Sequence, residues 1–74
     1  ILAQRAQVAT LEAELAKAAL QAEADEQLAE KGLISEILLR QSQSRAGELR
    51  MRRDLEAQRL HMAEEARDVQ LAVE

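Results

Sequence analysis

The side chains of this 74-residue chain that could do chemistry are one histidine and fourteen carboxylates. His61 lies between Leu60 and Met62, and no cysteine or second histidine accompanies it. Zinc sites and activated nucleophiles need several such side chains at a defined spacing. The carboxylates fall in sequence typical of exposed helices, which offers no pocket for paired acid–base catalysis. We therefore predict a protein that is not an enzyme, with no metal, no cofactor and no small-molecule substrate.

The composition predicts long helices rather than a globular core. The chain has no proline, no aromatic residue and only two glycines. Ala, Leu, Glu, Gln and Arg dominate, as in coiled coils. A chain this short, without large side chains, cannot enclose a wide core. We expect an all-α fold, a two-helix antiparallel coiled-coil hairpin.

The net charge of −4 argues against a general attraction to nucleic acid or anionic membranes. Arginines at 45, 50, 52 and 53 alternate with acids, and no aromatic side chain is present for base stacking. We therefore predict no nucleic-acid partner. No apolar run approaches the roughly 20 residues that span a bilayer. Because the chain begins at Ile1 without a methionine, we expect a fragment of a larger protein.

The segment from Leu28 to Ser35 contains the residues that end one helix and begin the next. Gly32 is suited to the left-handed conformation of a helix C-terminus, with Leu28 and Leu33 at the two contacting positions of a Schellman motif. Ser35 is suited to cap the next helix with its hydroxyl. Ile34 precedes this cap by one residue and can pack on Leu39 as a hydrophobic staple.

These signals divide the chain into a helix over 1–31, a turn over 32–35 and a helix over 36–74. A turn this short requires the helices to fold back as a hairpin. At 1.5 Å per residue the helices would be ~47 and ~59 Å long, so the second extends beyond the first by about two turns. The segment from Val69 to Val73 would then lack an internal partner.

The first helix shows one narrow apolar seam, at spacings of mostly three and four. Asp25 occupies a seam position nearer the turn, where we expect looser or wetter pairing. The seam residues are Ile1, Val8, Leu11, Leu15, Ala18 and Ala22.

The second helix shows two apolar sets that do not lie on one line. Near the turn they are Leu38, Leu39, Ser42, Ala46 and Leu49, and later Met51, Leu55, Met62, Ala66, Val69 and Val73. Either the buried face drifts around the helix or the helix uses more than one face. Counting outward from the turn, we expect Leu15 near Met51 and Leu11 near Leu55. Ion pairs four residues apart are expected at Glu36/Arg40, Glu48/Arg52, Arg50/Asp54 and Arg52/Glu56.

The turn resembles the hairpin tip of periplasmic adaptor proteins, also called membrane fusion proteins. Their tip motif is an arginine, followed four residues later by a leucine, which is followed seven residues later by a serine. Leu28 and Ser35 match the leucine and serine, and Ala24 stands where the arginine would be. The segments Ser35–Arg40 and Gly47–Leu49 look like the hemolysin-secretion branch, which works with ABC transporters in type I secretion.

This resemblance implies a partner at each end of the hairpin and an oligomer. The expected partners are an inner-membrane ABC transporter and a TolC-like outer-membrane channel, with several hairpins forming a tube in the periplasm. Attachment to the inner membrane would come from sequence outside this chain. The expected channel contacts are Leu28, Leu33, Ile34 and Ser35. Three alternatives stay open: a dimerising coiled coil paired through residues 51–73, a scaffold hairpin of another assembly, and a drug-efflux adaptor.

Overall fold

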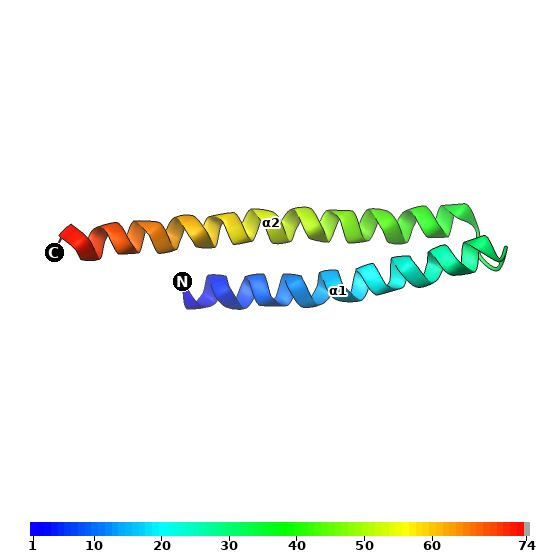
Figure 1. Cartoon of the computed structure of the whole chain (residues 1–74), viewed down its shortest axis with the longest axis horizontal. Coiled ribbons are helices and arrows are strands. Elements are labelled where there is room, and N and C mark those ends of the chain that lie inside the picture. Colours follow the sequence, from blue (N-terminus) through cyan, green and yellow to red (C-terminus); the bar gives the residue numbers. More distant parts are fainter. Residues whose placement is uncertain (74) are drawn as a thin grey trace.

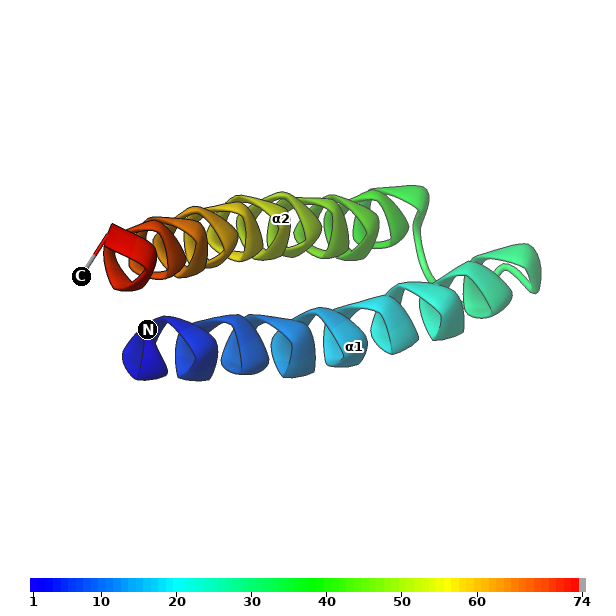
Figure 2. The same cartoon turned by 60° about the vertical axis from the view of Figure 1, so that its left-hand side comes forward.

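The computed structural model describes residues 1–73 and contains two helices, with no strand in that range. Helix α1 spans Leu2–Glu30 and helix α2 spans Glu36–Val73. They run antiparallel, side by side, with both termini at the same end of the molecule (Figures 1 and 2). The described chain measures 63 × 14 × 13 Å, so it is one helix pair in cross-section. The predicted all-α hairpin is confirmed.

Helix α1 ends in the predicted Schellman motif. Gly32 adopts a φ of 72°, which favours glycine because it has no Cβ. The Gly32 amide donates to the Ala29 carbonyl at 3.0 Å, and the Leu33 amide donates to the Leu28 carbonyl at 2.9 Å. These two bonds satisfy carbonyls that the end of a helix leaves without partners. The helix stops at Glu30, one residue before the predicted limit.

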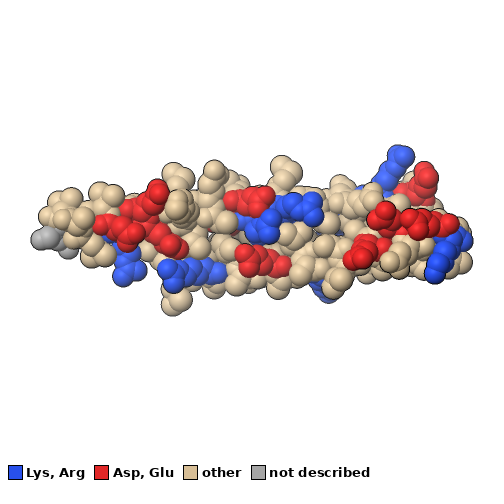
Figure 3. All heavy atoms as spheres, in the orientation of Figure 1, with Lys and Arg blue, Asp and Glu red and all other residues tan. Residues whose placement is uncertain are grey.

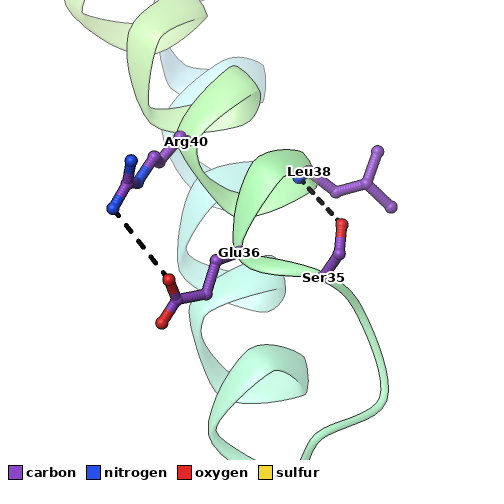
Figure 4. Close-up of polar contacts among 4 residues, drawn as sticks. All are labelled: Ser35, Glu36, Leu38 and Arg40. Carbon is purple, nitrogen blue, oxygen red and sulfur yellow. Dashed lines mark hydrogen bonds and ion pairs between the residues drawn. The ribbon is translucent and has the colours of Figure 1, made fainter.

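Helix α2 starts at the predicted cap. The Ser35 hydroxyl accepts the Leu38 amide at 3.2 Å, and the Ser35 carbonyl accepts the Leu39 amide at 3.2 Å (Figure 4). Glu36 lies in the first turn, where its negative charge is favoured by the helix dipole. Ile34 and Leu39 are both half-buried, as the predicted hydrophobic staple requires.

The core lies midway along the hairpin. Four side chains are buried, Leu15 and Ala18 from α1 and Ala46 and Leu49 from α2, and Leu11 and Ala22 pack against them. Ile1, Val8 and Asp25 are half-buried, so the predicted α1 seam is confirmed along its length. The Asp25 carboxylate accepts a hydrogen bond from the Gln21 amide at 3.0 Å in an exposed setting, which agrees with the wetter pairing expected there.

The predicted pairing of the later apolar residues of α2 is wrong. Met51 is 74% exposed and Leu55 is 48% exposed, and the α2 residues buried with Leu15 are Ala46 and Leu49. Residues two apart on a helix point about 200° from each other, so Met51 faces away when Leu49 faces inward. Leu38 is also exposed, so its place in the inner set is a second error.

The inner face of α2 instead continues at strict spacings of three and four. Eight partly or fully buried positions follow this spacing, and we term them the inner seam: Leu39, Ser42, Ala46, Leu49, Arg53, Glu56, Leu60 and Ala63. Gly47, Ala57 and Glu64 beside them are also half-buried. Met62, Ala66, Val69 and Val73 are exposed, like Met51 and Leu55. The later apolar residues of α2 therefore lie on a different face from the one that packs on α1, and that face is exposed.

Helix α2 extends past the start of α1 (Figure 1), because it has 38 residues against 29. The nine-residue difference corresponds to about 14 Å, or two and a half turns. Val69 and Val73 are exposed there, as expected for a segment that α1 does not cover. The predicted helix end at Glu74 lies outside the described residues.

Exposed ion pairs run along the hairpin. Glu36–Arg40 at 3.9 Å and Glu48–Arg52 at 2.8 Å form as predicted. The other two predictions are wrong, since Asp54 meets Arg53 at 2.7 Å and Glu56 meets Arg59 at 2.8 Å. Acidic and basic side chains are interspersed on the face shown in Figure 3. Charge of both signs on exposed helix faces favours solvation.

Candidate functional site

The closed end of the hairpin presents apolar side chains to solvent. Leu33 is 67% exposed and Leu28 is 36% exposed. Ile34 is half-buried, and Ser35 is exposed with its hydroxyl used in the cap. Of the four predicted contact residues, Leu33 is therefore the most available for a partner, and Ser35 has a structural role in starting α2.

Two exposed apolar residues at this end were not predicted as contacts. Ile37 is 69% exposed and Leu38 is exposed in the first turn of α2. Figure 4 shows the Leu38 side chain projecting away from the ribbons, while its amide bonds Ser35. The available signal was the cap itself. Once Ser35 starts the helix and Leu39 faces inward, Ile37 must point to the opposite side.

We term Leu28, Leu33, Ile37 and Leu38 the tip cluster. Single exposed leucines are ordinary on protein surfaces, but several exposed apolar side chains near one turn make this end a candidate interaction surface. The capping hydrogen bonds do not involve these side chains, since they come from backbone atoms and the Ser35 hydroxyl. The tip can therefore bind a partner without giving up the bonds that form it.

An acidic hollow lies beside the tip cluster. It is lined by Glu26, Ala29, Glu30, Glu36 and Leu39, from the last turns of α1 and the first turn of α2. Glu36 is also within 3.9 Å of Arg40. The surface that a partner meets at this end thus combines apolar side chains with carboxylates. Such a surface is complementary to apolar side chains next to a lysine or arginine.

The position at which the adaptor tip motif has an arginine is occupied here by solvent-exposed Ala24. Ala24 lies on α1, one turn before Leu28, and is exposed. Its methyl group offers no donor for a polar contact. The charged part of the tip surface is therefore supplied by the glutamates of the acidic hollow and by exposed Lys31, rather than by a cation at position 24.

The remaining candidates for chemistry lie away from the tip. Nε2 of His61 is 3.0 Å from Oε1 of Glu65, and both side chains are largely exposed on α2. Within residues 1–73 no group of histidine and carboxylate side chains is arranged to hold a metal ion.

No protein-family model matches the chain, and no curated protein or solved structure matches it significantly. Neither of the described helices contains a segment long and apolar enough to cross a membrane.

Proposed function

We propose that this chain is the spacer hairpin of a periplasmic adaptor in a type I secretion system, which docks its tip on a TolC-like outer-membrane channel. The inner-membrane partner is an ABC transporter, and several copies line the path of the exported substrate. The tip cluster at the closed end of the hairpin is the observation that carries this proposal.

The shape supports a mechanical role. A molecule 63 Å long and one helix pair wide encloses little interior, so partners can bind only along its sides or at its tip. The spacing between the two ends is set by helical rise, which changes little under load compared with a flexible linker. Such a hairpin holds its tip at a fixed distance from whatever carries its termini.

The tip supports apolar docking. Leu33 and Ile37 are each about two-thirds exposed, at 67% and 69%, and burying each would contribute roughly 1.5–3 kcal/mol at most. The neighbouring glutamates would direct the orientation of a partner that carries basic residues. A channel rim with apolar pockets and flanking lysines or arginines is the partner that this surface fits.

The decisive experiment is Leu33→Asp in the intact protein, with Leu20→Asp as its matched control. Both leucines are 67% exposed, but Leu20 lies in the middle of α1. We expect Leu33→Asp to abolish tip-to-channel cross-linking and secretion, while Leu20→Asp leaves both unchanged. Circular dichroism on both variants checks that helix content is kept. Normal secretion by a folded Leu33→Asp variant would exclude docking through the tip cluster.

A further inference from the structure

The face of α2 that points away from α1 carries its own apolar repeat. Its residues follow spacings of 4, 3, 4 and again 4, 3, 4, which is an 11-residue period. We term this set the outer stripe: Met51, Leu55, Gln58, Met62, Ala66, Val69 and Val73. All are exposed, with Met62 at 63% and Val69 at 65%. An 11-residue period keeps an apolar face nearly straight along a helix, so the stripe can meet a second helix over its length.

A shallow depression lies at the start of the outer stripe. It is lined by Met51, Asp54, Leu55 and Gln58, which are residues i, i+3, i+4 and i+7 of α2. Four residues at these positions form the hole that receives one side chain of a partner helix in knobs-into-holes packing. The apolar lining, from Met51 and Leu55, fits an aliphatic side chain. The surface is thus shaped for another helix that carries a comparable apolar repeat.

The charges beside the depression specify the direction of that helix. Asp54 lies along one edge of the stripe and Arg59 along the other. In a parallel pair of identical helices, opposite edges face each other and residue i lies near residue i+5 of the partner. Asp54 of each copy then lies beside Arg59 of the other. In an antiparallel pair, like edges face each other, so the acid-bearing edges and the arginine-bearing edges would repel.

We propose that two copies of this chain pair through their outer stripes, parallel and in register. Leu55 of each copy fills the depression on the other, and Gln58 faces Gln58 across the symmetry axis. Paired side-chain amides at such a position hydrogen-bond each other and fix the register. Two Asp54–Arg59 contacts flank this centre. The proposal goes beyond docking at the tip, and it makes specific the dimer that the sequence left open.

The intramolecular ion pairs leave donors and acceptors for these contacts. Asp54 uses Oδ1 for Arg53 at 2.7 Å, and Arg59 uses one terminal nitrogen for Glu56 at 2.8 Å. Carboxylates accept at both oxygens, and a guanidinium carries five N–H donors. The second oxygen of Asp54 and the remaining donors of Arg59 can therefore meet across the pair. Parallel pairing also brings both tip clusters to one end, so two tips approach a surface together.

Cysteine cross-linking tests the pairing, because the chain contains no native cysteine. Gln58→Cys in the 74-residue chain should give a disulfide-linked dimer on mild oxidation. Gln7→Cys, the same substitution at an exposed position of α1, should stay monomeric. A dimer that forms only when Gln58→Cys and Val69→Cys chains are mixed would show antiparallel pairing and overturn the proposal. So would equal cross-linking of the two single variants.

Charge exchange tests the direction independently of any cysteine. Asp54→Arg and Arg59→Asp should each weaken association in sedimentation equilibrium by about 2- to 10-fold, as for exposed ion pairs. The double variant, which recreates the pairs with exchanged partners, should recover most of that loss. If the double variant lost as much association free energy as the two single variants together, the proposal would be overturned. A wild-type chain that remains monomeric up to about 1 mM would also overturn it.

Discussion

A helix with one partner is expected to be apolar on the face that meets the partner and polar on the face in solvent. The two faces of α2 show the opposite difference. The inner seam carries Arg53 and Glu56, whose side chains are only 31% and 15% exposed. The outer stripe carries Met51, Leu55 and Met62, which are largely in water. Partial burial of charge costs free energy, and apolar side chains in water contribute nothing to folding. This difference is the basis for the second contact of α2 proposed above.

The same comparison shows where the hairpin derives its stability. The buried set is confined to the middle of the molecule, and beyond it the inner seam of α2 passes through Arg53 and Glu56 before the half-buried Leu60 and Ala63. At the closed end the two caps fix the turn with backbone bonds and the Ser35 hydroxyl. The hairpin is therefore held by a short apolar core and a well-satisfied turn, with weaker contacts beyond residue 53.

The largest expected difference between the two faces comes from truncating residues two positions apart. Leu49→Ala removes a buried side chain and should lower the free energy of unfolding by about 2–3 kcal/mol. Met51→Ala removes an exposed one and should change it by less than about 0.5 kcal/mol. Urea denaturation followed by circular dichroism, at concentrations low enough to avoid association, measures both. Equal losses for the two variants would contradict the assignment of the inner seam.

The different burial of Leu49 and Met51 illustrates which parts of the structure could be predicted from the sequence and which could not. The Gly32 stop and the Ser35 cap were predictable because capping depends on neighbouring residues alone. The α1 seam was predictable because that helix has one clear apolar line. On α2, the inner seam passes through Arg53 and Glu56, so apolarity selects the outer stripe instead. Continuing the three-and-four spacing beyond Leu49 would have found the inner face.

The exposed residues of the tip were predicted only in part, because the inner face of α2 was assigned incorrectly. Leu33 was recognised because it follows the helix stop, where no seam can cover it. Ile37 was missed because its exposure depends on the phase of α2, which is set jointly by Ser35 and by the packing of Leu39. Contact with a partner depends on which side chains are left uncovered, and that follows only once the inner face is known.

The turn glycine ends α1, and substituting it should give the next largest effect. Gly32→Ala forces a Cβ into a left-handed conformation and should cost about 1–2 kcal/mol of unfolding free energy. Gly47→Ala offers a matched control, because an added Cβ there meets nothing within 4 Å. It should instead stabilise the helix by about 0.5–1 kcal/mol. Thermal denaturation of both variants checks the opposite signs; the same sign for both would mean that the Gly32 geometry is not required.

The polar part of the inner seam can be tested by making it apolar. Glu56→Leu replaces a side chain that is 15% exposed and should raise the free energy of unfolding by about 1 kcal/mol. The loss of the exposed contact to Arg59 offsets little of this gain. Asp54→Leu, at a site that is 63% exposed, should leave stability nearly unchanged. Urea titration of the two variants measures both changes in the free energy of unfolding. A larger gain for Asp54→Leu than for Glu56→Leu would mean that the face of α2 carrying Asp54, rather than the inner seam, contacts α1.

The smallest effect is expected at the exposed ion pair that joins the two helices near the open end. Nε of Arg5 on α1 is 3.6 Å from Oε1 of Glu64 on α2, with side chains that are 61% and 39% exposed. Pairs this exposed contribute less than about 0.5–1 kcal/mol and weaken with salt. Glu64→Gln keeps the shape and should lower stability by no more than about 0.5 kcal/mol, a difference that disappears in high salt. Since α1 begins at Leu2, only three residues before Arg5, a larger loss in salt-free urea titrations would mean that the open end is held together by this contact.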